Sequence, residues 1–254
     1  MAGIRKTLVH WRDWVLLATV FGLARPLPFR WLQRIGRWLG LCCWYVAPFR
    51  KRVVLANLRA SFGDDLDERD IRRLGRDFYA QLGTTLLEFC GYWRLGPARI
   101  RALVDIEGEE HLEEILQRDE GALLVSAHFG NWELLGAWAA TFDRPVRFLV
   151  KTQSNQRVDQ LQNDLRERAG VGIIRSGPSL RAMIRTLREG GFIGLLGDQD
   201  GGAQGLFLPF LGRQASVFRG TAQLAWRLRC PVITGFLVRQ PDGRHRAIVQ
   251  GPID

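Results

Sequence analysis

The sequence has few cysteines and no long apolar run, and these two features limit the kinds of protein that it can be. Its four cysteines form no C-x-x-C pair and lie at no metal-ligand spacing from a histidine, so we read them as small apolar residues of a reducing compartment. The apolar run WVLLATVFGLA, residues 14–24, is eleven residues long, whereas crossing the hydrocarbon core of a membrane takes about 20. We therefore expect shallow insertion rather than a full span.

Several catalytic and metal-binding motifs are also absent. Ser126 lacks the G-x-S-x-G elbow of a serine hydrolase, and the H-E-x-x-H motif of a zinc protease does not occur. The run GDQDGG, residues 197–202, begins like a calcium loop, but an EF-hand would need glycine and glutamate where the sequence has Ala203 and Pro209. We expect neither a metal nor a cofactor.

Acidic residues are nearly missing from residues 1–60. This segment holds eleven of the 36 lysines and arginines but a single acidic residue, Asp13, so it carries a charge of +10 while the rest of the chain is neutral. It also holds five of the nine tryptophans, and tryptophan beside arginine is typical of a membrane surface. We predict that residues 1–60 form a helical, membrane-associating segment, with residues 31–49 as a helix lying in the interface.

The apolar faces of this basic segment could instead pack on the protein core. A signal peptide would also begin with charges and a short apolar run, but Arg25-Pro26-Leu27-Pro28 is a poor cleavage site. Nucleic-acid binding is disfavoured, because tryptophans clustered with leucines do not suit a solvated phosphate-binding surface.

Residues 61–254 alternate predicted strands and helices. The predicted strands are ALLVSA (122–127), VRFLV (146–150), GVGII (170–174), FIGLLG (192–197), VITGFLV (232–238) and RAIVQ (246–250). This alternation predicts an α/β fold with a mostly parallel sheet flanked by helices, preceded by the N-terminal membrane-associating helical segment. The chain stops at GPID directly after a strand, as it would if a C-terminal helix were missing.

The stretch SAHFGNWELLG, residues 126–136, places three polar side chains at the mouth of an apolar run. In one continuous helix, His128 and Glu133 would be rotated apart by about 140°. They can meet only if His128 lies in a strand-to-helix turn, capped by Asn131, and Glu133 lies in the first helical turn. A carboxylate bonded to one ring nitrogen would leave the other free to take a proton from a hydroxyl. A core histidine beside a capping glutamate is the alternative.

The run H-F-G-N-W-E resembles the H-x4-D/E motif of glycerolipid and lysophospholipid acyltransferases. Its N-W-E form is typical of the bacterial lipid A biosynthesis lauroyl/myristoyl acyltransferases. The run GLLGDQD, about 65 residues further on, and the run LFLPFLGRQAS after it strengthen this resemblance, which extends from about residue 5 to the last residue. The F-P-E-G-T-R phosphate-binding motif of the glycerolipid branch is absent, which argues against lysophosphatidate as the acceptor.

The resemblance implies roles for particular residues. It implies that His128 is the general base, that Glu133 is its partner and that Asp198 is a second essential carboxylate. It also implies an important cation near residues 166–168, for which Arg168 is our first choice and Arg166 our second. From its own position after FLPFLG, Arg213 could serve an anionic group, although such an arginine is more often a surface charge. The candidate substrate-binding residues are therefore Asn131, Arg166, Arg168 and Arg213.

The implied function is an acyltransferase of lipid A and lipopolysaccharide biosynthesis. We expect a monomer that transfers a fatty acyl group from acyl-acyl carrier protein to a lipid A precursor, at the cytoplasmic face of a bacterial inner membrane. An acidic carrier would suit a basic surface. The alternatives are an acyl-CoA-dependent enzyme acting on another glycolipid, such as a phosphatidylinositol mannoside, and a non-catalytic membrane-binding scaffold.

Overall fold

A computed structural model describes residues 2–47, 49–118, 120–176 and 179–253 of the chain. The chain divides into two compact units that alternate along the sequence. The first unit comprises residues 1–27, 89–197 and 220–254, and the second comprises residues 28–88 and 198–219. The predicted functional division near residue 60 stays a prediction.

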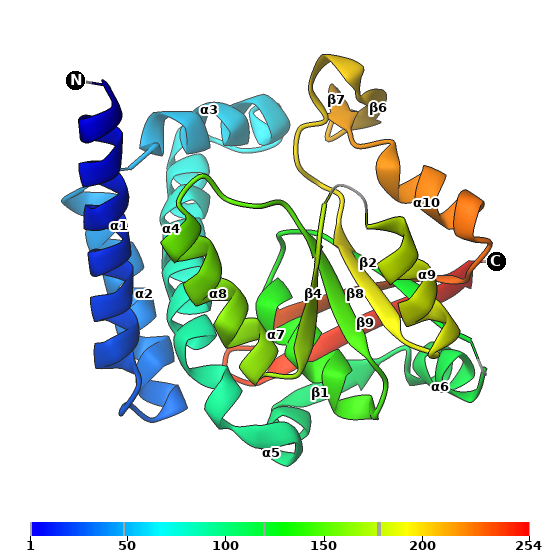
Figure 1. The fold of residues 1–254 in the computed structure, drawn as a ribbon. Helices are drawn as coiled ribbons and strands as arrows, with labels where there is room; N and C mark the ends of the chain where they lie inside the picture. Colours follow the sequence, from blue (N-terminus) through cyan, green and yellow to red (C-terminus); the bar gives the residue numbers. More distant parts are fainter. Residues whose placement is uncertain (1, 48, 119, 177–178, 254) are drawn as a thin grey trace. The chain divides into compact units, whose positions relative to one another are not determined.

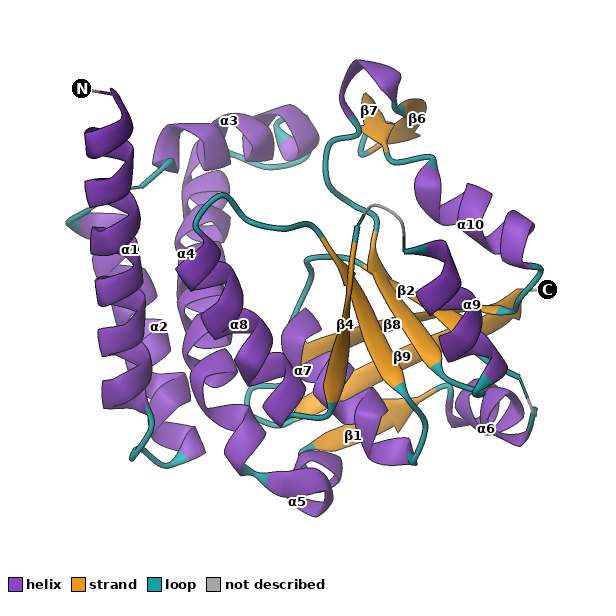
Figure 2. Ribbon diagram, in the orientation of Figure 1, coloured by secondary structure: helices purple, strands orange, loops and turns teal. Residues whose placement is uncertain are grey.

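A seven-stranded sheet forms the centre of the first unit (Figures 1 and 2). Its strands are β1 (Val104–Glu107), β2 (Ala122–Ser126), β3 (Val146–Val150), β4 (Val171–Arg175), β5 (Phe192–Leu196), β8 (Val232–Arg239) and β9 (His245–Ile253). They lie in the order β1-β9-β8-β2-β5-β3-β4, with β8 and β9 antiparallel and the other neighbouring pairs parallel. The predicted α/β fold with a mostly parallel sheet is confirmed.

Helices flank this sheet, because its central strands are apolar on both faces. The helices of the first unit are α1 (Ala2–Ala24), α5 (Gly96–Ala102), α6 (Glu109–Gln117), α7 (Trp132–Ala139), α8 (Gln156–Arg168), α9 (Leu180–Arg188) and α10 (Gly220–Leu228). On β2, Leu123 belongs to a buried cluster with Met183 of α9, while its neighbour Leu124 faces the α7 side with Leu135. Alternate side chains of one strand thus enter two different apolar layers.

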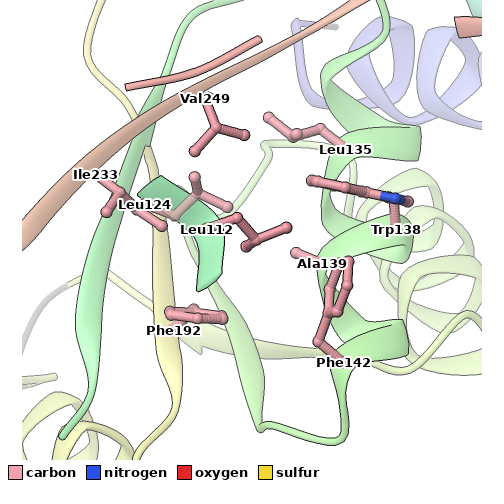
Figure 3. A pocket seen from close by; sticks show the side chains of 10 residues that line it. Leu112, Leu124, Leu135, Trp138, Ala139, Phe142, Phe192, Ile233 and Val249 are labelled. Carbon is pink, nitrogen blue, oxygen red and sulfur yellow. The ribbon is translucent and has the colours of Figure 1, made fainter. Parts of the chain in front are cut away.

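The α7 layer leaves a small apolar cavity against the sheet (Figure 3). Leu135, Trp138 and Phe142 line it from the helical side, and Leu124 and Val249 line it from the strands. Its volume is about 20 Å³, which is room for about one water-sized sphere. A space of this size is a packing gap rather than a site for a fatty acyl chain.

The second unit contains α2 (Phe29–Tyr45), α3 (Lys51–Phe62) and α4 (Glu68–Gly91), whose last three residues continue into the first unit. Helices α2 and α4 approach closely, because a Cβ atom on Gly36 would lie 2.5 Å from the carbonyl oxygen of Gly83. The contact buries the face of α2 that carries Leu32 and the glycines, and leaves Trp31 and Trp38 exposed. No helix in the described part of the chain is long and apolar enough to cross a membrane.

A hairpin of β6 (Leu206–Phe210) and β7 (Arg213–Val217) also belongs to the second unit. The sequence analysis predicted no strand between residues 197 and 232, and that prediction was wrong. Leu211 and Gly212 both have positive φ, as a two-residue hairpin turn requires. The strand signal was hidden because LFLPF is apolar without alternation, and every residue of β6 is exposed. Strand β1 was also missed, because four residues make a weak pattern.

Candidate functional site

The turn from β2 to α7 has the geometry predicted from SAHFGNWELLG. The side chain of Asn131 caps α7 by accepting a hydrogen bond from the backbone N–H of Leu134, at 3.0 Å. Gly130 has φ +63°, and a Cβ atom there would lie 2.1 Å from the carbonyl oxygen of Leu237. Only glycine fits this close approach to β8. The predicted turn and cap are therefore confirmed, with Glu133 in the first turn of α7.

His128 lies in this turn and is exposed to solvent. Its ring packs edge-on against Trp132, the first residue of α7, with ring centroids 5.2 Å apart. The imidazole is thus held at the rim of the first unit, where a substrate hydroxyl could reach it. Pairing of His128 with Glu133 stays a prediction.

Glu133 is buried and forms a two-pronged ion pair with Arg166 of α8. Its Oε1 accepts a hydrogen bond from Nη2 of Arg166 at 2.6 Å, and its Oε2 accepts one from Nε at 3.0 Å. Desolvation works against the charge on Arg166, but the hydrogen bond and attraction from Glu133 outweigh it, so the pKa of Arg166 is raised. An ionised carboxylate keeps further lone pairs, so this pairing leaves Glu133 able to accept another hydrogen bond.

Arg166, rather than our first choice Arg168, is the cation that the structure brings to Glu133. Arg168 is exposed, and its guanidinium lies 5.2 Å from the ring centroid of Trp93. The guanidinium of Arg166 lies 5.8 Å from the ring centroid of Phe89, at the end of α4. The sequence could not separate the two arginines, because only the contacts of α8 decide which one faces inward.

Polar residues on the same face of α8 as Arg166 were missed by the sequence analysis. Asn163 accepts a hydrogen bond from Nη1 of Arg166, and Asp159 accepts one from Asn163. The signal that could have found them is their helical spacing, but polar residues at this spacing ordinarily mark the solvent-exposed face of a helix.

Asp198 and Arg213 belong to the second unit. Asp198 is exposed and follows the end of β5 by two residues, and Arg213 is the exposed first residue of β7. Their assigned roles stay predictions. Among the described residues, no group of three or more His, Cys, Asp or Glu side chains is arranged to hold a metal ion.

Taken together, the β2–α7 turn offers an exposed imidazole and a buried carboxylate whose negative charge is supported by an arginine. An imidazole can take a proton from a hydroxyl, and a carboxylate paired with it would favour the imidazolium that forms. The rigid cap at Asn131 and the close approach at Gly130 keep the turn in one conformation.

Comparison with known proteins identifies relatives along nearly the whole chain. Residues 3–254 match the family model described as bacterial lipid A biosynthesis acyltransferase. The chain is 27% identical over 246 residues to the lipid A biosynthesis lauroyltransferase of Escherichia coli K12, covering 96% of this chain and 79% of that protein. It is 24% identical over 246 residues to the lipid A biosynthesis myristoyltransferase of the same strain, covering 95% and 74%. It is 22% identical over 152 residues to the phosphatidylinositol mannoside acyltransferase of Mycolicibacterium smegmatis, covering 56% and 50%.

Proposed function

Because the chain belongs to the bacterial lipid A biosynthesis acyltransferase family and is therefore an acyltransferase, we propose that it transfers a fatty acyl group from acyl-acyl carrier protein to a hydroxyl of a lipid A precursor. The observation that carries the mechanism is the ion pair between Glu133 and Arg166, because Glu133 lies in the helix that follows His128. It supplies a fixed, ionised carboxylate close in the chain to an imidazole, a group that can accept a proton at neutral pH.

In the proposed reaction, His128 takes the proton of the acceptor hydroxyl. The hydroxyl oxygen forms a bond with the thioester carbonyl carbon, and the resulting tetrahedral intermediate loses the carbon–sulfur bond. The thiolate then leaves with the proton held by the imidazolium. The ester and the free carrier thiol balance the reaction, and neither a covalent acyl-enzyme nor a metal is required.

Glu133 supports this step by favouring the charged imidazole, and Arg166 holds the Glu133 carboxylate in one orientation with two hydrogen bonds. We propose that Asp198 acts as a second essential carboxylate. Arg213 and Arg168, both exposed, would meet anionic groups of the donor or the acceptor. Backbone N–H groups or an arginine would stabilise the oxyanion.

The donor and the acceptor are separate proposals. The names of the Escherichia coli relatives support a lipid A precursor as acceptor. The name of the Mycolicibacterium smegmatis relative favours the second candidate, an acyl-CoA-dependent enzyme acting on a phosphatidylinositol mannoside, although that match covers little more than half of the chain.

We further propose that the protein works as a monomer at the cytoplasmic face of a bacterial inner membrane. Two exposed apolar surfaces support membrane association. One is the face of α2 with Trp31 and Trp38, in a segment with a charge of +10, and the other is the β6–β7 hairpin with Phe207 and Phe210. Exposed aromatic groups beside arginines suit the headgroup region of an anionic membrane.

Product masses test this proposal. The purified protein is incubated with acyl-acyl carrier protein or acyl-CoA and with a lipid A precursor or a phosphatidylinositol mannoside, and acylated products are read by mass spectrometry. We expect the carrier-protein and lipid A combination to give the fastest transfer. Faster transfer from acyl-CoA to the mannoside would support the second candidate. A non-catalytic scaffold would form no ester with any combination, and it would keep its binding activity after His128→Ala.

A further inference from the structure

Helix α8 buries a polar face. The side chains on this face are Asn155, Asp159, Asn163 and Arg166, which follow one another at helical spacings of four, four and three residues. Asp159 is 5% exposed and Asn163 is 4% exposed, although a helix in this position would ordinarily bury leucine or valine. We call these four residues the polar face of α8.

The polar face forms a chain of hydrogen bonds that ends at Glu133. Nη1 of Arg166 donates to Oδ1 of Asn163 at 2.9 Å, and Nδ2 of Asn163 donates to Oδ2 of Asp159 at 3.3 Å. The amide oxygen of Asn163 therefore bonds to the arginine, and its amide nitrogen bonds to the carboxylate of Asp159. This arrangement holds the guanidinium from the side opposite to Glu133.

Asp159 is itself fixed from outside the helix. The backbone N–H of Gln153 donates to its Oδ1 at 3.0 Å, and Arg175 of β4 donates to its Oδ2 at 2.7 Å. Burial works against ionisation of this carboxyl, but these hydrogen bonds outweigh it and lower the pKa of Asp159. At the start of α8, Asn155 donates to the backbone oxygen of His10 in α1 at 2.8 Å. The polar face is thus tied to the loop before α8, to the sheet and to α1.

Stability alone does not account for such a face. Replacing buried charged networks by well-packed apolar side chains is often neutral or stabilising, whereas a complete network specifies one geometry. An arginine side chain has many rotamers, and ordering it against a carboxylate requires further contacts. Asn163, which accepts a hydrogen bond from Arg166 and is itself held by Asp159, supplies such a contact.

We propose that Asn163 and Asp159 are positioning residues of the acyl transfer reaction. They hold the guanidinium of Arg166 in the orientation that keeps both of its prongs on Glu133, and they act on the reaction through that pair. This inference rests on the proposed function, because it assigns a role within the same site.

Two substitutions of Asn163 test the inference. Asn163→Leu keeps a similar volume but removes both the acceptor for Arg166 and the donor to Asp159, so the guanidinium should lose its support. We expect kcat to fall about 10- to 100-fold, with KM for the acceptor changed by less than about threefold. Asn163→Gln keeps an amide that can both accept and donate, so its kcat should stay within about tenfold of wild type.

Two controls separate positioning from folding. Gln160→Ala alters an exposed residue of α8 and should leave kcat unchanged within about twofold. Thermal melting of each variant reports stability, which Asn163→Gln should largely keep. The inference is overturned if Asn163→Leu keeps wild-type kcat, or if Asn163→Gln keeps the wild-type melting temperature but loses as much kcat as Asn163→Leu.

The same measurements distinguish this inference from the proposed function. If wild-type protein forms no ester with any donor and acceptor, the proposed function fails. If wild type is active, His128→Ala is inactive and the Asn163 variants behave as wild type, the proposed function stands and the positioning role is rejected.

Discussion

Helices α2 and α8 bury opposite kinds of side chain. On α2, Trp31 is 53% exposed and Trp38 is 63% exposed, while the buried face carries two glycines, Leu32 and Trp44. On α8, the buried face carries the carboxylate of Asp159 and the amide of Asn163, each with hydrogen-bond partners. Helix α8 departs from the usual pattern by burying polar side chains, and α2 departs from it by exposing aromatic side chains.

These two departures from ordinary burial have different physical causes. A buried polar group is tolerated when its hydrogen bonds are made within the protein, and the bonds of α8 lead to Glu133. An exposed aromatic face is tolerated when another apolar medium covers it, and the charge around α2 favours an anionic membrane. Departure from ordinary burial therefore points to chemistry in one region and to lipid contact in the other.

The largest expected effect separates the chemical region from the membrane region. His128→Ala should lower kcat/KM by about 10²- to 10⁴-fold, because it removes the general base. Glu133→Gln keeps a hydrogen-bonding group but loses the charge that favours the imidazolium, so it should cost a similar amount. When two residues act as one unit, replacing both lowers the rate little more than replacing one, so the double variant should resemble His128→Ala. Vesicle binding should stay at the wild-type level in all three.

Steady-state kinetics of the two single variants and the double variant measure how the losses in kcat/KM combine. Losses that multiply in the double variant would mean that His128 and Glu133 act independently. Reduced vesicle binding by any of the three would mean that the two regions are not separate.

Arg166 and Arg168 provide a matched pair on one helix. Arg166→Lys keeps a charge but cannot reproduce two parallel hydrogen bonds to Glu133, so kcat should fall about 10- to 100-fold. Its melting temperature should also fall, because the pair is largely buried. Arg168→Lys changes an exposed side chain, and kcat should stay within about twofold of wild type. Equal losses in the two variants would contradict the assignment of Arg166 as the positioned cation.

The exposed face of α2 should govern lipid binding. Trp31→Ala with Trp38→Ala should weaken sedimentation with vesicles of phosphatidylglycerol and phosphatidylcholine by roughly tenfold or more, because binding scales with the apolar area inserted. Binding should also weaken as sodium chloride rises, since the segment is basic. Trp226→Ala, on α10, removes an exposed tryptophan outside the basic segment and serves as the control. A loss of binding as large in the control as in the α2 variant would rule out a specific α2 surface.

The smallest expected effect concerns acid stability. The pKa of Asp159 is lowered in the folded protein, so its contribution to folding is present above the unfolded pKa of about 3.9 and is lost as pH falls below about 4. Asp159→Asn has no such group. The difference in unfolding free energy between wild type and variant should therefore shrink as pH falls from 6 to 3, as measured by urea unfolding. A difference that stays constant over this range would show that the carboxylate is not linked to folding.

Much of the α/β fold was predictable because local patterns agree with it. The predicted strands at residues 146–150, 192–197 and 232–238 match β3, β5 and β8 to within one residue at each end. The turn before α7 was also predictable, since Gly130 and Asn131 have the residue types that its backbone and cap require. Strand β1 and the β6–β7 hairpin were not, because the alternation V-D-I-E of β1 spans only four residues and β6 is apolar without alternation.

By itself, the sequence determined the order of strands and helices, the basic tryptophan-rich segment and the turn that carries His128, because each depends on residues close together in the chain. Only the tertiary structure decided that Arg166 rather than Arg168 reaches Glu133, and that α8 buries its polar face. The physical reason is that burial depends on which surfaces distant segments cover. Glu133 and Arg166 are 33 residues apart in the chain, and Asp159 and Arg175 are 16 apart. Each pair meets only when the sheet and α8 pack together.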